Sequence, residues 1–422
     1  MNQATLEWMR SDWNQRARED AFYYAGFADW KQSLETFASS ATTAVPAIEC
    51  ELARLPPAPT PGNLIGLEIG CGPGRLMAAM GRHFRELHGV DISDEMIGLA
   101  RGILKDSPHL HPRVNNGTDL SFFPDEFFDF VYSYAVFQHI PSKPVVLNYL
   151  REARRVLKGG GIFRAQLDSL PEIESPDTWT GCSFSAAEIA QFARVNGFAL
   201  LAMAGEGSHY FWVTLQRIEP SNEAERVPAL LAVTTAEGAR SVPQRGKGAG
   251  VSLWIDGAPA TSSLADFAIA FDGRTQLGCY LHSIGPGGYT FVNAPVPRDI
   301  AAGPARVSLK YRDQTIGEEE IEILPVAREP RVLSITDAVS KLLETRITCG
   351  SFKATLEDVA DPNDVSFHIG GLPAQVAHIE CLAPLIDRYY FTVKAPESVP
   401  RGTYEMKILV SGAELAATVE IA

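Results

Sequence analysis

The chain has 422 residues, which at roughly 100–200 residues per domain suggests two to four domains, and its 45% hydrophobic and 21% charged residues are ordinary for a globular protein. A formal net charge of −14 argues against a general nucleic-acid binder, which would need a basic face. No apolar run approaches the roughly 18 residues of a membrane span, and the charged, amphipathic N-terminus lacks the pattern of a secretory signal.

The cysteine pattern bears on metal binding and on the redox compartment. The six cysteines are scattered and form no CxxC pair, so we expect neither a metal cluster nor a disulfide framework. They are Cys50, Cys71, Cys182, Cys279, Cys349 and Cys381. The sequence therefore predicts reduced thiols in a cytoplasmic protein without bound metal.

The first half of the chain alternates strand and helix patterns up to about Arg217. Short apolar runs with turn signals on both sides are typical of strands buried in a parallel sheet. The expected strands are residues 64–70, 88–93, 128–137, 161–167 and 210–216, and the expected helices are residues 75–84, 94–104, 143–157 and 185–198. Ser93 or Asp94 would cap the second helix, and Gly159 with Gly160 would end the third. This alternation predicts a doubly wound α/β domain with a parallel sheet.

The pattern changes after about residue 220, where short alternating strands replace the helices. An internal repeat pairs residues 228–236 with 330–338, 255–260 with 369–374, and 291–295 with 391–396. Two copies of one all-β unit of roughly 100 residues fit this repeat, and their size and strand spacing suit an immunoglobulin-like sandwich. We therefore expect three domains, at residues 1–218, 219–327 and 328–422.

The strongest chemical signal is the run EIGCGPG, from Glu68 to Gly74, between an expected strand and an expected helix. Glycines there permit a tight turn and a close approach of the backbone to a ligand. The free N–H groups of the following helix give the loop a local positive field. A dinucleotide loop would read GxGxxG, but the sixth position is Arg75. The spacing is instead GxGxG, with an acidic residue two positions before the first glycine.

This spacing resembles the cofactor loop of class I S-adenosylmethionine-dependent methyltransferases. In that family the loop, here Gly70, Cys71, Gly72 and Gly74, wraps the methionine end of S-adenosylmethionine. The resemblance implies that Glu68 supports the amino group of the cofactor, directly or through water. It also implies S-adenosylmethionine as the cofactor and S-adenosylhomocysteine as the product.

Further matches to the family follow along the chain. Asp91 ends the next expected strand, where a carboxylate can accept both ribose hydroxyl hydrogens, although a dinucleotide site predicts the same residue. The resemblance implies that Ile92 packs on the adenine ring. The adenine-contacting acid of the family falls on Asn116, with Gly117 supplying a backbone N–H, and Tyr134 should face the methionine portion of the cofactor.

The match to the family has one departure, at the adenine contact, and extends to a further segment of the chain. Asn116 departs from the usual Asp of the family, so Asp119 is an alternative partner for the adenine amino group. Residues 151–167 resemble the helix, glycine turn and fifth strand of the family. Together the matches cover roughly residues 64–167 and imply a Rossmann-like methyltransferase domain.

The catalytic residue is harder to read than the cofactor site. The sulfonium methyl group is already activated, so the enzyme must place a nucleophile in line with the S–CH3 bond and exclude water. His139 follows the fourth strand, where open α/β sheets bind ligands, and is a candidate general base. The alternative is a structural or cofactor-wall histidine. His209 and Tyr210, before the last strand, are further candidates at the rim.

Other residues have competing interpretations. The N-terminal segment carries an aromatic cluster, which predicts a helical cap whose Tyr23 or Tyr24 contacts substrate or cofactor, or whose aromatics are simply core. His109 and His111 are expected in a solvated loop rather than at a metal. Cys71 is expected to be a small filler beneath the cofactor.

The tandem β units resemble immunoglobulin-like domains of the IPT/TIG type, on IGGLPAQV and VPRGTYEMKILVSG. The resemblance implies oligomerisation or binding of a protein partner, recruitment of substrate, or a spacer role. Fusion to such units hints at a glycan or a lipid-linked acceptor.

Two function classes remain in competition. The first is a methyltransferase acting on a small-molecule, glycan or lipid-linked acceptor, with oxygen as the expected methyl-accepting atom. The second is a non-catalytic cofactor-binding scaffold whose β domains bind partners. A nucleic-acid methyltransferase ranks third, because residues 134–141 read YAVFQHIP where an NPPY-like motif would be expected for amino-group targets. A dehydrogenase ranks last because of Arg75.

Overall fold

The computed structural model describes residues 3–26, 30–55, 63–171, 176–219, 227–246, 248–283, 289–338, 345–383 and 386–422. The chain divides into two compact units. Unit 1 consists of Met1–Pro228, Asp256–Phe267 and Gly278–Val292, and unit 2 of Ala229–Ile255, Ala268–Leu277 and Asn293–Ala422. Segments of the expected second domain, residues 219–327, therefore belong to both units.

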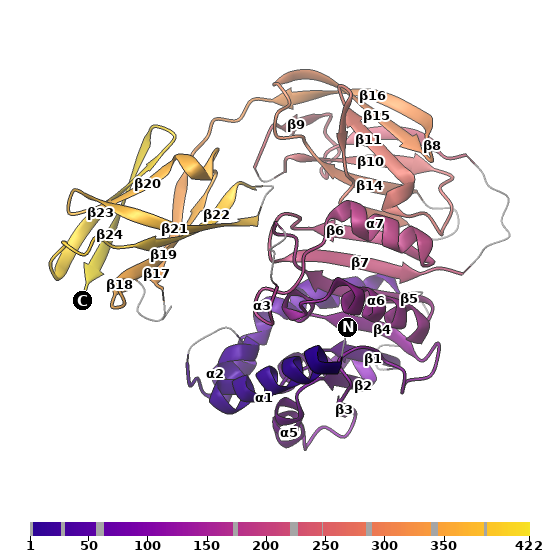
Figure 1. Ribbon diagram of the computed structural model, residues 1–422. Helices are drawn as coiled ribbons and strands as arrows, with labels where there is room; N and C mark the ends of the chain where they lie inside the picture. The colour runs from indigo at the N-terminus through magenta and orange to yellow at the C-terminus, as the bar shows by residue number, and fades with distance from the viewer. Residues whose placement is uncertain are drawn as a thin grey trace. The chain divides into compact units, whose positions relative to one another are not determined.

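Unit 1 is built on a sheet with the strand order β3-β2-β1-β4-β5-β7-β6-β13 (Figure 1). Its strands are β1 (Leu64–Ile69), β2 (Phe84–Asp91), β3 (Leu110–Val114), β4 (Phe128–Ser133), β5 (Leu157–Leu167), β6 (Phe198–Ala204), β7 (Phe211–Arg217) and β13 (Tyr280–Ser283). The strands β1 to β5 are parallel, which confirms the Rossmann-like α/β prediction. The strand order reverses between β1 and β4, since β2 and β3 lie on one side of β1 and β4 and β5 lie on the other. Open α/β sheets bind ligands at such a switch point. Strand β7 runs antiparallel to β5 and β6.

Seven α-helices lie in the described part of unit 1. They are α1 (Gln3–Gly26), α2 (Leu34–Ser39), α3 (Ala41–Glu49), α4 (Arg75–Met80), α5 (Asp94–Ile103), α6 (Lys143–Val156) and α7 (Ala186–Val195), with short 3-10 turns η1 (Cys50–Arg54), η2 (Gly81–His83) and η3 (Phe137–His139). Helices α4 and α5 pack on β2, α6 packs on β5, and α7 packs on β6. The helical N-terminal cap that the sequence predicts is present as α1 to α3.

Local sequence signals explain several helix ends. Ser93 caps α5, since its Oγ accepts a hydrogen bond from Met96 N at 3.1 Å. Ser185 and Glu188 form a capping box that begins α7. The expected glycine stop after α6 is wrong, because α6 passes directly into β5 and Gly160 lies inside that strand with φ 78°.

Two strands of unit 1 were not expected. Strand β6 follows α7 after a turn at Asn196 and Gly197, and its apolar run reads equally well as the end of a helix. Strand β3 contains His111, which the sequence placed in a solvated loop. His111 is the register partner of His88 on β2, and the two imidazole rings lie 4.9 Å apart. The loop expectation is therefore wrong for His111, while His109 lies in the turn before β3.

Segments from beyond residue 219 extend the sheet of unit 1. Strand β13 pairs antiparallel with β6 through Tyr280 and Ala202. Arg54 at the end of η1 donates from Nη1 to Leu281 O at 2.6 Å, and its guanidinium lies 4.2 Å from the Tyr280 ring centroid. These contacts cover the β6 edge, which would otherwise present unpaired backbone groups.

Unit 2 is all-β in its described residues apart from short 3-10 turns. Its strands are β8 (Ala229–Thr234), β9 (Ser241–Pro243), β10 (Gly250–Asp256), β11 (Phe267–Phe271), β12 (Arg274–Gln276), β14 (Thr290–Pro295), β15 (Gly303–Tyr311), β16 (Gln314–Leu324), β17 (Arg331–Asp337), β18 (Arg346–Ile347), β19 (Ser351–Glu357), β20 (Val365–Ile369), β21 (Leu372–Ala383), β22 (Arg388–Lys394), β23 (Gly402–Val410) and β24 (Ala413–Ile421), a few of which include residues of unit 1. The expected hairpin in residues 403–421 is β23–β24.

The strand orders agree with an internal repeat. One sheet has the strand order β12-β11-β15-β16-β9. The sheet of residues 331–421 contains the equivalent strand order β21-β20-β23-β24-β18. In each, a short strand pairs parallel with the last long strand, β9 with β16 and β18 with β24. The matching of residues 255–260 to 369–374 is wrong, because 369–374 form the β20–β21 turn, whose counterpart in this order is the β11–β12 turn at 271–276.

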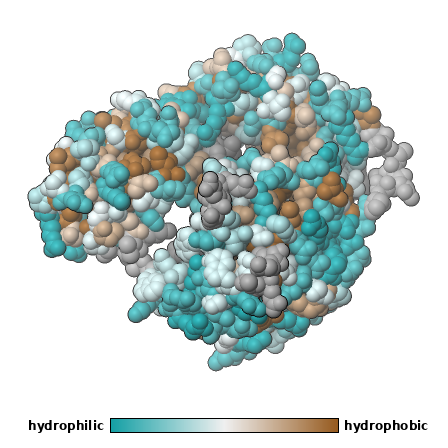
Figure 2. All heavy atoms as spheres, viewed as in Figure 1, coloured by the Kyte–Doolittle hydropathy of each residue, from teal (hydrophilic) through white to brown (hydrophobic). Residues whose placement is uncertain are grey.

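Apolar side chains gather in separate cores. In residues 335–419 the core contains Phe352, Phe367 and Phe391, and the ring of Phe367 lies 5.9 Å from that of Phe352 and 5.6 Å from that of Phe391. On the face shown in Figure 2, hydrophilic residues cover most of the surface and hydrophobic residues form scattered patches. Within the described residues, no helix has both the length and the hydrophobicity of a membrane span.

Candidate functional site

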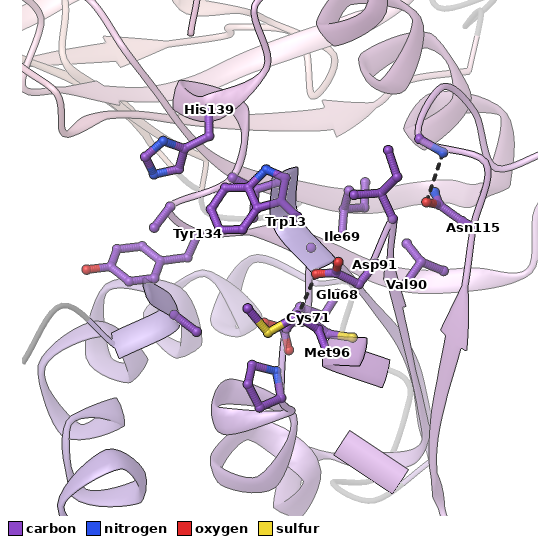
Figure 3. A pocket seen from close by; sticks show the side chains of 18 of the residues that line it. Trp13, Glu68, Ile69, Cys71, Val90, Asp91, Met96, Asn115, Tyr134 and His139 are labelled. Carbon is purple, nitrogen blue, oxygen red and sulfur yellow. Dashed lines mark hydrogen bonds between the residues drawn. The ribbon is translucent and has the colours of Figure 1, made fainter. Parts of the chain in front are cut away.

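A pocket lies beyond the carboxyl ends of β1, β2 and β4 and contains about 900 Å³ of space, part of it open to solvent. Its walls come from α1, the glycine loop, the ends of β2 and β3, and the segment after β4 (Figure 3). Of the residues predicted from sequence, the lining includes Glu68, Gly70, Cys71, Gly72, Asp91, Ile92, Gly117, Tyr134 and His139. The structure thus brings together residues that are up to 71 positions apart in the sequence.

The glycine loop has the backbone geometry that its sequence predicts. Gly70, Gly72 and Gly74 have φ angles of 76°, 51° and 88°, in the left-handed region that favours glycine. A Cβ on Gly70 would lie 2.2 Å from Val136 Cγ2, and one on Gly74 would lie 2.8 Å from Leu104 Cδ1. Gly70 and Gly74 are therefore fixed by conformation and by space. Gly74 supports the turn from outside the pocket lining.

Asp91 ends β2 and organises two backbone segments of the pocket. Its Oδ2 accepts a hydrogen bond from Gly72 N, and its Oδ1 accepts one from Ser93 N, both at 2.9 Å. Burial raises the pKa of this carboxyl above its ordinary value, and the backbone hydrogen bonds oppose that shift. The carboxylate is thus held in one orientation against the glycine loop (Figure 3).

Glu68 is the second carboxyl group of the pocket and is buried, at 2% exposure on β1. Its Oε2 accepts a hydrogen bond from Tyr132 Oη at 3.0 Å. Burial raises the pKa of Glu68 to about 8, against the hydrogen bond from Tyr132 and the charge of Arg75, which lower it. A cation placed beside this group would favour its ionised form.

The loop after β3 presents Asn115 to the pocket rather than Asn116. Asn115 is 6% exposed, donates from Nδ2 to Tyr149 Oη at 2.8 Å and accepts from Gly117 N at 3.0 Å. Asn116 is exposed and donates to Asp119 Oδ2 at 2.9 Å, outside the pocket lining. Gly117 lies so close to Ile92 that a Cβ there would be 2.4 Å from Ile92 Cδ1.

Tyr134 and Arg75 form one end of the pocket. The Tyr134 ring stacks on Trp212 of β7 at 5.5 Å, and the Arg75 guanidinium lies 5.9 Å from the Tyr134 ring centroid. Arg75 is 9% exposed, and among the described residues it donates to two neutral oxygens, Ser40 Oγ and Ala25 O. A buried guanidinium held in this way can bind an anionic ligand group.

His139 lies in η3, 4% exposed, with Trp13 beside it on the same side of the pocket (Figure 3). Its Nδ1 is 3.1 Å from Trp179 O, so Nδ1 donates, and its Nε2 is 3.3 Å from Gln138 Nε2 and accepts. Burial lowers the pKa of His139 to about 4. The imidazole is therefore neutral at physiological pH and is a weak proton acceptor.

Helix α1 forms a wall of the pocket, where the sequence predicts a cap with a ligand contact from Tyr23 or Tyr24. Met9 and Trp13 line the pocket, and Arg10 donates to Ile92 O at 3.2 Å and to Asn115 O at 3.0 Å. Tyr24 also lines the pocket, whereas Tyr23 does not appear in the lining. These contacts join residues more than 80 positions apart, so no local pattern could have predicted them.

The remaining candidates fall in different places. Cys71 is buried beneath the pocket, and burial raises the pKa of its thiol well above the ordinary value, which keeps it protonated. His209 and Tyr210 lie in the turn between β6 and β7, outside the pocket lining. The pocket residues that the sequence analysis missed include Arg75 as a binding group, Asn115 and Trp13. A polar residue directly after β3 was the available signal for Asn115.

Comparison with known proteins supports the same region. Residues 67–165 match the family model of the methyltransferase domain. A probable methyltransferase, ltbC, from Aspergillus luteorubrus is 32% identical over 106 residues, 23% of this chain and 37% of that protein. A ubiquinone biosynthesis O-methyltransferase from Xanthomonas oryzae pv. oryzae is 30% identical over 107 residues, 25% of this chain and 44% of that protein. The chain spans less than half the length of these curated relatives.

Solved structures of methyltransferases also resemble part of this chain, at low sequence identity. A phosphoethanolamine N-methyltransferase from Haemonchus contortus has a TM-score of 0.39 and 12% identity, over 54% of this chain and 52% of that chain. A geranyl diphosphate methyltransferase has a TM-score of 0.38 and 16% identity, over 51% of this chain and 100% of that chain.

Residues 67–165 are thus similar to a methyltransferase domain. S-adenosylmethionine is the cofactor that the sequence predicts for such a domain. The buried Glu68 and the half-buried Asp91, with the glycine loop between them, fit a ligand that carries an ammonium group and a ribose.

Proposed function

We propose that the whole chain is an S-adenosylmethionine-dependent methyltransferase that methylates an oxygen of a small-molecule, glycan or lipid-linked acceptor. One observation carries the proposal: the buried Glu68 and the half-buried Asp91 line one pocket, on either side of a glycine loop whose conformation needs glycine. Keeping carboxyl groups partly or fully out of water costs stability unless a ligand uses them. A scaffold without catalysis would have less reason to keep this set.

The residues of the pocket suggest how the cofactor is held. We assign the amino group to Glu68, the ribose hydroxyls to Asp91, and the methionine end to Gly70, Cys71, Gly72 and Tyr134. Ile92 would pack on the adenine ring, and Gly117 lies against Ile92. Because Asn115 faces the pocket and Asn116 does not, Asn115 is the better placed amide for the adenine edge.

The chemistry then requires positioning more than activation. The bound cofactor supplies an already activated methyl group. Trp13, His139 and Ile140 cover one side of the pocket, where they can exclude water and orient an acceptor. Oxygen as the methyl-accepting atom is supported by the O-methyltransferase named among the relatives, which matches 25% of this chain.

The β modules belong to a further proposal. We propose that residues 219–327 and 328–422 are immunoglobulin-like sandwiches of the IPT/TIG type, on the strength of their repeated strand order. Their use would be oligomerisation or the binding of a protein partner. Because strand β13 pairs with β6 of the sheet in unit 1, this part of the chain is not a flexible linker.

The test is titration calorimetry of the full chain with S-adenosylhomocysteine, with NADH as the control. Micromolar binding of the first and none of the second is the expected result and justifies an acceptor screen with oxygen nucleophiles. Binding of neither ligand to a folded, ligand-free sample would overturn the proposal. It would favour the second candidate, a scaffold whose β modules bind partners.

A further inference from the structure

A row of buried polar side chains crosses the sheet of unit 1. Its members are successive register partners on neighbouring strands: Glu68 on β1, Tyr132 on β4, Arg164 on β5 and Thr214 on β7. None of the four is more than 7% exposed. Two hydrogen bonds lie in the row, from Tyr132 to Glu68 at 3.0 Å and from Arg164 to Thr214 at 2.8 Å. Burying a guanidinium in such a row costs more than burying a neutral group, so Arg164 needs partners.

The partners of Arg164 come from three other elements. It donates from Nε to Ala47 O of α3 at 3.0 Å, and its Nη1 lies 3.8 Å from Glu51 Oε1 in η1. Glu51 is 5% exposed, so the two charges face each other away from water. The Arg164 guanidinium also lies 4.5 Å from the ring centroid of Trp212 on β7. At that distance a cation and an aromatic ring attract each other.

Trp212 contacts both Arg164 and the pocket wall. Its ring stacks on that of Tyr134, with the centroids 5.5 Å and the planes 12° apart. Tyr134 lines the pocket, and the Arg75 guanidinium lies 5.9 Å from its ring centroid. Trp212 itself is outside the pocket lining. It can therefore act on a ligand by fixing the Tyr134 ring.

The backbone beside Tyr134 is strained and is held by the same strand. Ala135 has φ 56°, in the left-handed region that favours glycine. Such a conformation persists only where the surroundings hold it. Gln166, two residues after Arg164 on the same face of β5, accepts a hydrogen bond from Ala135 N at 2.9 Å. Strand β5 thus supports this segment twice, through the Tyr134 ring by way of Trp212 and through the next backbone N–H.

Arg164 is connected in turn to β13, a strand from beyond residue 219 that belongs to unit 1. Glu51, its buried partner, accepts a hydrogen bond from Arg54 Nε. Arg54 donates to Leu281 O at 2.6 Å, and its guanidinium lies 4.2 Å from the Tyr280 ring centroid. Described contacts therefore lead without a gap from β13 to the side chains that support the pocket wall.

We propose that Arg164 is a positioning residue of the cofactor site. Its guanidinium fixes the Trp212 ring, and Trp212 fixes the Tyr134 ring against the methionine end of the bound cofactor. Strand β13 fixes Arg164 through Arg54 and Glu51, and so belongs to the methyltransferase site although its sequence lies among the β units. The inference rests on the proposed function and deepens it, because it names residues outside the pocket on which cofactor affinity depends.

The first test is calorimetry of full-length variants with S-adenosylhomocysteine. Arg164→Met and Trp212→Leu should each weaken binding about fivefold to tenfold, as loss of one desolvated cation–π or stacking contact would. Trp212→Phe keeps a flat ring beside Tyr134 and should stay within about threefold of wild type. Arg217→Met is the matched control and should stay within about twofold. Arg217 is an equally buried arginine, on β7, but it donates to Leu157 O at the start of β5, away from the pocket.

Stability and coupling separate positioning from a purely structural role. Arg164→Met and Arg217→Met should both lower the melting temperature, because each loses hydrogen bonds of a buried guanidinium, but only the first should lower affinity. The double variant Arg164→Met/Trp212→Leu should bind within about twofold of the weaker single variant, since both act through one ring. Trp212→Leu removes no charge and decides the question if Arg164→Met does not fold. Wild-type affinity in Trp212→Leu, an equal loss in Arg217→Met, or multiplied losses in the double variant overturns the proposal.

Fluorine NMR tests the part of β13. The chain has six tryptophans, so 5-fluorotryptophan labelling gives six signals, and the one missing from Trp212→Phe belongs to Trp212. Tyr280→Leu removes the ring that Arg54 contacts. It should shift the Trp212 signal in ligand-free protein and weaken S-adenosylhomocysteine binding about threefold. Tyr289→Leu, at a tyrosine that is 54% exposed in the same part of the chain, should do neither. An unshifted Trp212 signal in Tyr280→Leu overturns the role of β13.

The wild-type protein separates this inference from the proposed function. If wild type binds S-adenosylhomocysteine and the Arg164 and Trp212 variants bind it equally well, the positioning role is wrong and the methyltransferase proposal stands. If wild type does not bind S-adenosylhomocysteine, the proposed function itself fails.

Discussion

At the scale of single residues, the two carboxyl groups of the pocket, half-buried Asp91 and buried Glu68, have different roles. Asp91 is held by two backbone N–H groups, which favour its charged form and fix its direction. Glu68 receives one hydrogen bond from Tyr132 and is raised by burial to a pKa of about 8. Asp91 is therefore preorganised for a neutral polar ligand group, and Glu68 is poised to respond to a cation.

Removal of the Asp91 carboxylate should weaken cofactor binding. We expect Asp91→Ala to lower the affinity for S-adenosylhomocysteine by at least ~1.5 kcal/mol, roughly tenfold, because buried hydrogen bonds to a charged group are lost. Titration calorimetry measures this directly. Asp94→Ala, an exposed acid in the first turn of α5, is the matched control and should stay within about twofold of wild type. Equal affinity of wild type and Asp91→Ala would contradict the ribose assignment.

The raised pKa of Glu68 predicts a pH-dependent affinity. Below about pH 8 the carboxyl is protonated in the ligand-free protein, and an ammonium group beside it favours ionisation, so binding releases a proton. The affinity for S-adenosylhomocysteine should thus rise by up to about tenfold per pH unit between pH 6 and 8 and then level off. Calorimetry at pH 7 in two buffers of different ionisation enthalpy counts the released proton.

Glu68→Gln is the control for that linkage, since it keeps the shape and removes the titration. Its affinity should be lower at pH 8 and nearly independent of pH between 6 and 8. The same raised pKa costs the ligand-free protein stability as pH rises from about 4.5 to 8, because the folded state binds the extra proton. A pH-independent affinity in wild type would place the ammonium group away from Glu68.

At the scale of elements, helix α1 completes a site whose other parts are strand ends and loops. Arg10 connects α1 to the strand ends. Its guanidinium donates to the backbone oxygen of Ile92, the residue after β2, and to that of Asn115, the residue after β3. Arg16 holds the same helix to the loop after β5, through Thr178 O at 3.2 Å and Thr178 Oγ1 at 3.0 Å. The helix thus positions both the adenine end and the acceptor end.

Arg10→Met should loosen the adenine end while its apolar stem still packs. Loss of two charged hydrogen bonds in a partly buried setting is expected to weaken S-adenosylhomocysteine binding by about 1–2 kcal/mol, mainly through faster dissociation. Arg18→Met serves as the control, since its ion pair with Glu95 is exposed and worth roughly 0–1 kcal/mol. Stopped-flow dissociation rates that are the same for both variants would refute this role of α1.

The sequence could predict those elements whose signals are local. Residue spacing and capping chemistry act within a few residues. The sequence therefore predicted the glycine loop, the Ser93 cap and the parallel core strands. The sequence did not show that Asn115, rather than Asn116, faces the pocket, because a one-residue shift at a strand end changes which side chain points inward. The contacts of Arg10 span 82 and 105 positions, which no local pattern reveals.

At the scale of the whole molecule, the pocket lies within unit 1, and the aromatic core of residues 335–419 lies within unit 2. A ligand stabilises only the part of a protein whose folded state binds it. S-adenosylhomocysteine should therefore raise the melting temperature of one unfolding transition and leave that of the C-terminal core unchanged. The melting temperatures of the two transitions therefore report separately on ligand binding and on independent folding of the C-terminal core.

Phe391→Ala makes this separation measurable. Phe391 is fully buried between β19 and β21 and contacts the ring of Phe367, so its truncation should destabilise that core by about 3–5 kcal/mol. In differential scanning calorimetry the transition lowered by Phe391→Ala should be the one that S-adenosylhomocysteine does not raise, and the ligand affinity should match wild type. Thr392→Ala, whose half-buried side chain points to the other face of β22, is the control and should shift that transition little. A single transition that moves with both the ligand and Phe391→Ala would mean instead that the two units unfold as one cooperative body.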